Sequence, residues 1–298
     1  MTNNLSQSIA SQISIDEYVA LSASPVLLYT TMVDAPADKP DIVKQRPDAL
    51  IPNSLLFDFQ SVIRDTASSL SNMMPSVDVF EREVRRLGIN IGDEIVVYDD
   101  FGNFCASRVW FMFKSMGHDN IRVLEGGLPQ WHSRGLNTQA LAAKPIKKGS
   151  FVATPNPQYQ FVDSDFIAKS VVKSVAQATG THLPLLDARS QARFSGKEKL
   201  DAPNMRSGHI PNSVNIPYRH LQCNNGGFLP IDALKHVFTT ALTNYESQSA
   251  MAFTCGSGVT ACILAQAADA LGHSPLYVYD GSWSDWGAQH HLPISTGE

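Results

Sequence analysis

The chain has 298 residues, of which 43% are hydrophobic and 17% charged, and its formal net charge is −5. At roughly 150 residues per domain this length predicts about two domains. The slight acidity argues against a nucleic-acid or anionic-membrane surface, which would carry clustered lysine and arginine. The N-terminal residues lack the pattern of a signal peptide, and no apolar run approaches the ~20 residues of a membrane span. Four cysteines without C-x-x-C spacing predict neither a metal site nor a disulfide framework, so we expect a soluble, cytoplasmic protein.

Strands and helices are predicted to alternate along the chain. Apolar runs indicate buried strands over residues 26–29, 95–98 and 121–124, and an amphipathic helix over 79–87 that stops at Gly88. Further strands are predicted over 183–187, 250–253 and 276–279, with helices over 232–242 and 260–271. This alternation favours α/β architecture, a parallel sheet with helices on both faces. Ligands of such sheets bind outside the carboxyl ends of the strands.

Two stretches of sequence occur twice. Residues 117–131 and 272–286 share a glycine-histidine pair, an apolar strand pattern and a final tryptophan at a constant offset of 155, and Ile-Pro-Asn-Ser occurs at both 51–54 and 210–213. Two repeats in the same order indicate a duplicated domain. Between them, residues 139–157 are rich in proline, lysine and small residues and indicate a linker. We therefore expect a non-catalytic domain over residues 1–138 and a catalytic domain over 158–298.

The stretch Cys255-Gly256-Ser257-Gly258-Val259-Thr260 lies between a predicted strand and a predicted helix. The glycines allow the backbone to curl so that successive N–H groups point into one cup with the sulfur at its floor. The helix N-terminus favours a thiolate over a thiol. Free cysteines are most often inert core residues, but packing alone explains neither the glycines nor the two hydroxyls. Cys255 is therefore the candidate nucleophile.

The repeat identifies the half that carries the chemistry. At the offset of 155 Cys255 aligns with Asp100, so the first half has no cysteine at this point of its loop and would supply a wall of the cleft and stability. Cys262, two turns into the predicted helix, is expected in the core, as are Trp283 and Trp286. Structural hydrogen bonds rather than catalysis are expected for the histidines of the turns, His118, His209 and His273.

The duplicated domain, the cysteine loop and the segments 209–217 and 279–286 resemble the two-domain sulfurtransferases of the rhodanese superfamily over nearly the whole chain. The resemblance implies two tandem rhodanese-like domains, no cofactor, and a ping-pong reaction in which Cys255 takes sulfur from a small anionic donor as a persulfide. The acceptor would be cyanide, a thiol or thioredoxin. The loop is most similar to that of 3-mercaptopyruvate sulfurtransferases, because thiosulfate sulfurtransferases usually carry cations after the cysteine. In this reading the loop residues Gly256, Gly258, Val259 and Thr260 bind the substrate.

Further roles follow from the same resemblance. Ser257 would donate a hydrogen bond to the sulfur or to the substrate carbonyl, with capping of the helix as an equal alternative. Arg193 would bind the substrate anion, whereas Arg189 is expected to pair with Asp187. Many mercaptopyruvate enzymes have a second arginine where this chain has Ala202, and Arg206 is the candidate to replace it. The family also places an aspartate and a histidine near the serine, where counting gives Gln60 and Asn72, so a serine-centred proton relay is not expected.

Three alternatives remain open at this point. Thiosulfate could be the donor, although Gly256 and Ser257 supply no cation for a doubly charged anion. The protein could be a persulfide carrier with little turnover on small donors, which the missing acid and histidine favour. A phosphatase is disfavoured, because the related loops of those enzymes end in an arginine where this chain has Ala261.

Overall fold

A computed structural model describes residues 9–33, 47–141, 146–173, 183–198, 204–243 and 250–297. The chain divides into two compact units. Unit 1 comprises Met1–Ala67, Met74–Asn156 and Gln222–Phe228, and unit 2 comprises Ser68–Met73, Pro157–Leu221 and Leu229–Glu298. Each unit therefore consists mainly of one half of the sequence and includes one short segment from the other half. The expectation of two contiguous domains did not include these two segments.

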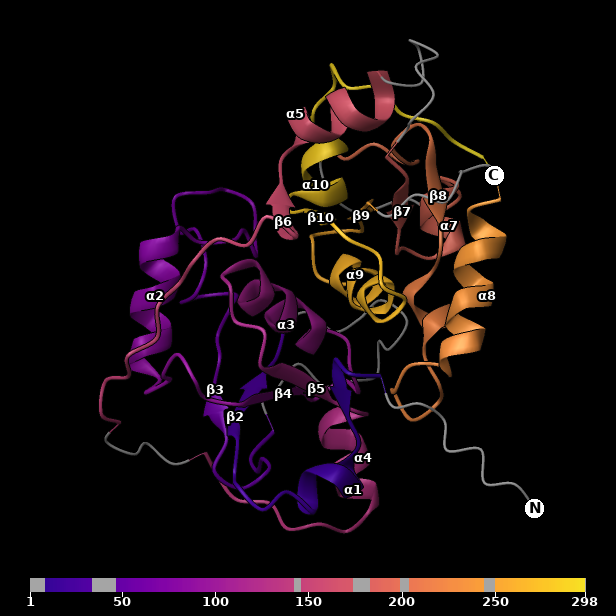
Figure 1. The fold of residues 1–298 in the computed structure, drawn as a ribbon. Helices are drawn as coiled ribbons and strands as arrows, with labels where there is room; N and C mark the ends of the chain where they lie inside the picture. The colour runs from indigo at the N-terminus through magenta and orange to yellow at the C-terminus, as the bar shows by residue number, and fades with distance from the viewer. Residues whose placement is uncertain are drawn as a thin grey trace, which may run out of the picture. The chain divides into compact units, whose positions relative to one another are not determined.

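Unit 1 is built on a five-stranded parallel sheet (Figure 1). The strands lie in the order β1 (Gln12–Ile13), β5 (Ile121–Leu124), β4 (Ile95–Asp99), β2 (Val26–Thr30) and β3 (Leu55–Leu56). Helices α1 (Ile15–Val19) and α4 (Gly127–Ser133) pack on one face, where Ile15, Leu128 and Trp131 join the strand residues of a single core cluster. Helices α2 (Val77–Arg86) and α3 (Ala106–Ser115) cover the other face (Figure 1).

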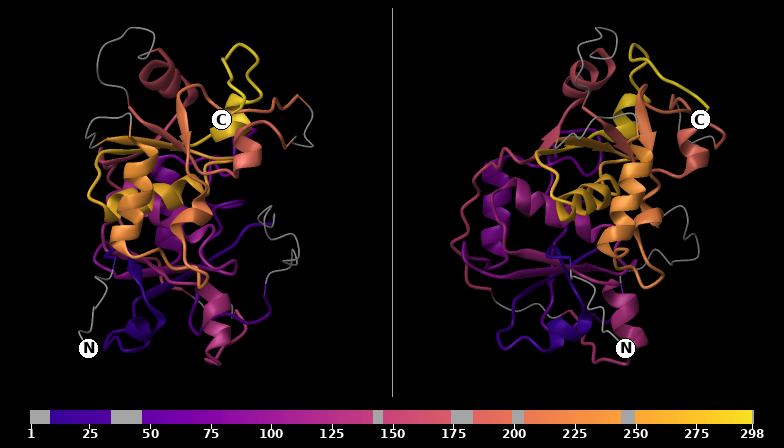
Figure 2. Two further views of the ribbon diagram at one scale, coloured as in Figure 1. Left: turned by 90° about the vertical axis from the view of Figure 1, so that its right-hand side faces the viewer. Right: turned by 45° about the vertical axis from the view of Figure 1, so that its right-hand side comes forward.

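Unit 2 repeats this topology strand for strand. Its order is β6 (Tyr159–Val162), β10 (Leu276–Tyr279), β9 (Met251–Thr254), β7 (Leu185–Asp187) and β8 (Ser213–Asn215), again all parallel. Helices α5 (Ser164–Ile167), continued by a π-helical turn over Ala168–Lys173, and α10 (Ser282–Trp286) lie on one face. Helices α8 (Ile231–Ala241) and α9 (Ala261–Ala270) lie on the other (Figure 2). The short helix α7 (Gln191–Phe194) follows β7, and a 3-10 turn covers Tyr218–Leu221.

The central strand of each sheet is buried along its whole length. Ile95–Asp99 and Met251–Thr254 are buried at every residue, as expected for strands with helices on both faces. In α9 the residues from Ala261 to Ala268 are all buried. The duplicated α/β fold predicted from the sequence is thus confirmed. No helix among the described residues is long and apolar enough to cross a bilayer.

Candidate active site

Cys255 directly follows β9, the middle strand of its sheet. Thr260, five residues after Cys255, is the N-cap of α9. The side chain of Cys255 is buried, with 2% of its surface exposed. Gly258 has a left-handed backbone with φ of +73°, which a residue with a Cβ rarely adopts. The loop therefore turns sharply behind a sulfur held at the switch from strand to helix.

The N-terminal residues of α10 anchor this loop through its carbonyl groups. The N–H of Trp283 donates to the carbonyl of Cys255 at 3.0 Å. The N–H and the hydroxyl of Ser284 both donate to the carbonyl of Gly256, at 2.9 and 2.8 Å. With these two carbonyls held by α10, the loop cannot turn its peptide groups around, and its remaining N–H groups keep fixed directions.

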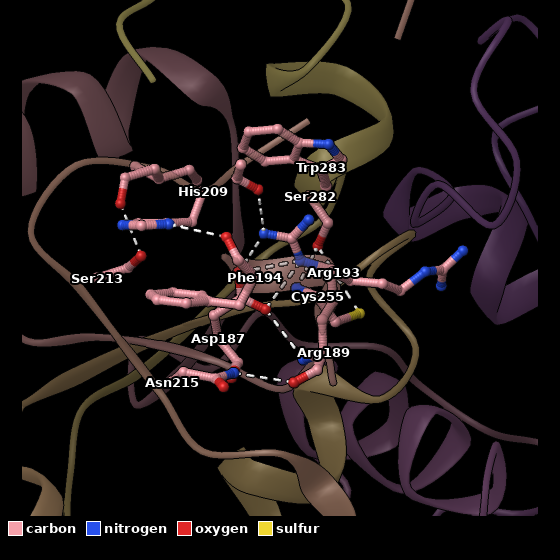
Figure 3. Close-up of polar contacts among 12 residues, drawn as sticks. Asp187, Arg189, Arg193, Phe194, His209, Ser213, Asn215, Cys255, Ser282 and Trp283 are labelled. Carbon is pink, nitrogen blue, oxygen red and sulfur yellow. Dashed lines mark hydrogen bonds and ion pairs between the residues drawn. The ribbon is translucent and has the colours of Figure 1, made fainter. Parts of the chain in front are cut away.

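Ser282 contacts the cysteine loop and was not singled out by the sequence interpretation. Its hydroxyl accepts hydrogen bonds from the N–H groups of Cys255 and Gly258, at 3.2 and 3.1 Å, and donates to the carbonyl of Tyr279 at 2.7 Å. The hydroxyl oxygen lies 4.0 Å from the sulfur of Cys255 (Figure 3). Since its single proton is taken by the carbonyl, we assign the hydroxyl to the loop backbone rather than to the sulfur. The internal repeat could have pointed to Ser282, because it places a serine where the first half has Gly127.

Five N–H groups at the cysteine loop and the start of α9 are available to a ligand. Within the described part of the chain, the N–H groups of Gly256, Ser257, Val259, Thr260 and Ala261 donate no hydrogen bond. The side chains of Val259 and Thr260 are buried, so their contribution to a ligand comes from the backbone. Consecutive N–H groups at the N-terminus of a helix form an anion-binding concavity.

The side chain of Ser257 is contacted by Asn72, one of the two residues expected near it from the sequence. The carboxamide of Asn72, within the segment Ser68–Met73 of unit 2, donates to the hydroxyl of Ser257 at 3.4 Å. Because the amide is the donor, the hydroxyl proton of Ser257 is left to be donated to a further acceptor. Helix α9 has Thr260 at its N-cap, so capping by Ser257 is not what the structure has. Gln60 belongs to unit 1, where its side-chain oxygen accepts from the N–H of Val33 at 2.7 Å.

Arg189 forms the buried ion pair expected from the sequence. Its guanidinium contacts both carboxylate oxygens of Asp187 at 2.7 to 3.1 Å, and donates to the carbonyl of Gly208 at 2.9 Å (Figure 3). The guanidinium also lies 4.4 Å from the ring centroid of Trp283. Trp283 in turn follows Ser282, so this ion pair supports the same helix that anchors the cysteine loop. The expected pairing of Arg189 with Asp187 is confirmed.

Arg193 is the less constrained of the two arginines after β7. It lies in α7, whose N-cap Ser190 accepts from the N–H of Arg193. Its Nε lies 3.2 Å from a carboxylate oxygen of Glu198, close enough for an ion pair although not aligned as a hydrogen bond. The two side chains are 29% and 44% exposed, so this pair is weak. Figure 3 shows the guanidinium extending away from the Asp187–Arg189 pair.

The surroundings of Arg206 do not fit its candidate role as a second substrate-binding arginine. Its guanidinium donates to the backbone carbonyls of Trp286, Gly287, Gln289 and Leu292 at 2.7 to 3.0 Å. Four of its five N–H groups are thus committed to the C-terminal segment, which is a structural role, and we leave Arg206 out of the substrate site. The position of Ala202 lies outside the described residues.

The remaining candidates behave as core residues. Cys262 is fully buried, and Trp283 and Trp286 are 2% and 0% exposed, as expected. The ring of His209 stacks on Phe194 at a centroid distance of 3.8 Å, and its Nδ1 lies 2.9 Å from the Phe194 carbonyl. Burial lowers the pKa of His209, with partial compensation from this hydrogen bond. Within the described ranges, no three His, Cys, Asp or Glu side chains gather as a metal site.

Comparisons with known proteins agree with this geometry. The model of the rhodanese-like domain matches residues 44–134 and 171–289. Thiosulfate/3-mercaptopyruvate sulfurtransferase 1, mitochondrial, of Arabidopsis thaliana is 34% identical over 278 residues, covering 88% of this chain and 72% of that protein. The 3-mercaptopyruvate sulfurtransferase of Escherichia coli K12 is 32% identical over 244 residues, 82% of each chain. The crystal structure of Tum1 from Saccharomyces cerevisiae superimposes with a TM-score of 0.79 at 25% identity, covering 96% of this chain and 98% of that one.

Proposed function

The chain belongs to the rhodanese-like sulfurtransferases, and on that premise we propose that it transfers a sulfane sulfur from 3-mercaptopyruvate to a thiophilic acceptor through a persulfide on Cys255. The names of the relatives include both 3-mercaptopyruvate and thiosulfate, so the choice of donor rests on the residues of the loop. The acceptor would be cyanide, a thiol or thioredoxin.

The reaction has two half-steps. In the first, the thiolate of Cys255 attacks the sulfur of 3-mercaptopyruvate, an S–S bond forms, and the C–S bond breaks with its electron pair moving to the carbon. The enolate so formed takes up a proton and leaves as pyruvate. In the second, the acceptor attacks the outer sulfur of the persulfide and restores the thiolate, with cyanide leaving as thiocyanate. No external oxidant or reductant is needed, because the sulfur is oxidised from the thiol to the sulfane level while the carbon that keeps the electron pair is reduced to the methyl group of pyruvate.

The observation that carries the proposal is the set of five N–H groups, those of Gly256, Ser257, Val259, Thr260 and Ala261, without a partner in the described chain around a buried cysteine. An attacking thiolate and an outer persulfide sulfur are both anionic, and preorganised N–H groups stabilise such charge without reorganisation during the reaction. The anchoring of the loop by α10 maintains this arrangement in the resting protein.

Two side chains would select the donor. Arg193 would bind the carboxylate of 3-mercaptopyruvate, since its only described ionic partner is the exposed Glu198. Ser257 would donate to the carbonyl oxygen where the enolate charge develops, because its partner Asn72 occupies the hydroxyl as a donor. Neither Asn72 nor Gln60 can act as a general base, so the proton that converts the enolate to pyruvate would come from water or from the substrate thiol.

Thiosulfate remains the second candidate donor. It is a doubly charged anion, and the loop residues Gly256 and Ser257 bring no cation to balance that charge. A persulfide carrier that receives its sulfur from another protein is the alternative from a different class. It would need the same cysteine loop but little turnover with either small donor.

The test is thiocyanate formation from cyanide, measured in parallel with 3-mercaptopyruvate and with thiosulfate. We expect a kcat/KM for 3-mercaptopyruvate at least tenfold higher than for thiosulfate. A preference for thiosulfate would overturn the proposed donor, and a failure of both donors would favour the carrier.

Substitution Cys255→Ser is the matching control on the mechanism. We expect it to abolish transfer from either donor while the circular dichroism spectrum and the Tm stay near those of the unsubstituted protein, because serine has nearly the same volume. Mass spectrometry should show a gain of one sulfur atom on the unsubstituted protein after exposure to the donor alone. Normal turnover by the serine variant would refute the persulfide mechanism.

A further inference from the structure

The loop after β4 in unit 1 aligns with the cysteine loop at the offset of 155. The strand residue before this loop has a carboxylate that the proposed reaction does not use. Asp99, the last residue of β4, is fully buried. One of its oxygens accepts from the N–H groups of Phe101 and Asn103, at 3.0 and 2.8 Å. The other accepts from Phe104, Cys105 and Ala106, at 2.7, 2.7 and 2.9 Å. A single side chain therefore binds five backbone N–H groups at the N-terminus of α3.

The same five positions in unit 2 form the cysteine loop. They correspond to Gly256, Gly258, Val259, Thr260 and Ala261. Of these, Gly258 donates to Ser282, and the other four donate no hydrogen bond within the described chain. The loop is thus built twice, once closed on an internal carboxylate and once open.

The residue that aligns with Asp99 is Thr254. Its hydroxyl is buried, and among the described residues it has no hydrogen-bond partner. Threonine is too short to reach across the loop as the aspartate does. The side chain at the end of the central strand therefore distinguishes the closed loop from the open one.

The shape of the closed loop is also held by contacts other than Asp99. The side chain of Asn103, which has a left-handed φ of +71°, donates to the carbonyl of Gly226 at 3.3 Å. The side chain of Gln222 donates to the carbonyl of Asn103 at 2.7 Å. Both partners lie in the segment Gln222–Phe228 of unit 1. These contacts do not involve the carboxylate and would keep the N–H groups converging without it.

We propose that unit 1 contains an anion-binding cradle of the same construction as the cysteine loop, occupied by the chain's own Asp99 carboxylate, and that removal of this side chain opens it to small carboxylates. The internal carboxylate keeps anionic donors out of the half that has no nucleophile. This inference does not depend on which donor the protein uses, because it concerns only the backbone of unit 1.

The test is hydrogen exchange, followed by mass spectrometry, in the full-length protein carrying Asp99→Ala or Asp99→Gly. Loss of a charge-assisted acceptor should speed exchange of the peptide covering residues 100–107 by roughly ten- to hundredfold. Alanine removes the equivalent of formate and glycine the equivalent of acetate. Formate should therefore restore slow exchange in Asp99→Ala, and acetate in Asp99→Gly, whereas chloride at equal ionic strength should restore neither.

Asp100→Asn is the matched control, because it changes the neighbouring carboxylate, which accepts none of the five N–H groups. Its loop should exchange as slowly as in the unsubstituted protein, with or without formate. The inference is wrong if formate and acetate slow the loop no more than chloride does. If neither Asp99 variant folds, the unsubstituted protein still decides. The amides of Phe101, Asn103, Phe104, Cys105 and Ala106 must then be resistant to exchange, and fast exchange at these five positions would refute the inference.

Discussion

Ser282 adopts φ of +50°, a left-handed conformation that costs a residue with a Cβ on the order of 1–2 kcal/mol. Its counterpart in unit 1, Gly127, has nearly the same φ of +52°. The backbone of the fold therefore requires this conformation in both units, and glycine is the residue that adopts it without strain. Unit 2 tolerates a serine because its hydroxyl accepts from two N–H groups of the cysteine loop. The backbone strain of Ser282 thus accompanies its hydrogen bonds to the cysteine loop.

Substitution Ser282→Gly should separate that contact from the strain. Glycine relieves the backbone but releases the N–H groups of Cys255 and Gly258, so we expect the Tm to change by only a few degrees and kcat to fall about tenfold. Ser282→Ala loses the same hydrogen bonds and keeps the strain, so its Tm should be lower than that of the glycine variant. Steady-state kinetics of thiocyanate formation and thermal unfolding measure both effects. A glycine variant with unchanged kcat would mean that the hydroxyl does not position the loop.

Arg193 is expected to act on substrate binding rather than on the fold. Arg193→Ala should raise the KM for 3-mercaptopyruvate by about tenfold, the effect of losing one charge-assisted contact, with a much smaller change in Tm. Glu198→Gln removes the competing carboxylate and should leave KM unchanged or slightly lower. Kinetics of the two variants side by side provide the comparison. Equal KM values for Arg193→Ala and the unsubstituted protein would assign this arginine to the structure of its loop.

At the scale of elements, the sequence predicted what is long and apolar. The strands over 121–124 and 276–279 have the predicted bounds, and those predicted over 26–29 and 95–98 are one residue longer at the end. The strand predicted over 250–253 is shifted by one residue, and the one predicted over 183–187 begins two residues later. Strands β1 and β3 have two residues each and were not predicted, because so short a segment carries no periodicity. The contacts of the loops could not be predicted from the sequence either. Nothing in the spacing of Ser282 and Cys255 indicates that one binds the backbone of the other, since β10 and β9 become neighbours only in the sheet.

The cysteine loop itself can accept a side chain at Gly256. A Cβ built there has no atom within 4 Å, and the φ of this glycine is not left-handed. Gly256→Arg should therefore fold normally and add a cation next to Cys255. We expect the ratio of kcat/KM for thiosulfate to that for 3-mercaptopyruvate to rise about tenfold or more, as a single charge-assisted contact to the doubly charged donor would produce.

Gly256→Gln is the control for that experiment, because it adds a side chain of similar length without charge. It should lower the rates with both donors to a similar degree. If the arginine and glutamine variants show the same donor ratio, size rather than charge governs donor choice at this position.

For the whole molecule, the constant offset of 155 was enough to predict two copies of one fold, and the alignment of Cys255 with Asp100 places the proposed nucleophile in the second half of the sequence. The membership of Ser68–Met73 in unit 2 and of Gln222–Phe228 in unit 1 could not be predicted. Both segments are loops without apolar periodicity, and their place depends on contacts between residues far apart in sequence. Asn72 shows the consequence, since it lies 185 residues from Ser257 and yet contacts it.

Each half of the sequence also carries a buried histidine whose protonation opposes folding. His118 packs against Phe113 and Phe151 in unit 1, and His209 stacks on Phe194 in unit 2. Burial lowers the pKa of both rings below the usual value of 6.5. Well above pH 6.5 both rings are neutral in the folded and in the unfolded state, so they do not affect the free energy of unfolding. As the pH falls below 6.5 the unfolded chain takes up protons first, so stability decreases until the folded-state pKa values are passed.

We therefore expect the Tm to fall between pH 7 and pH 5, and His118→Phe to reduce that fall because phenylalanine fits an aromatic environment and does not titrate. His132→Phe makes the same change on an exposed side chain of α4 and should leave the pH dependence of the Tm as it was. Thermal unfolding of the three proteins at half-unit steps of pH measures the effect. A His118→Phe variant whose Tm falls as steeply as that of the unsubstituted protein would place the acid sensitivity elsewhere in the molecule.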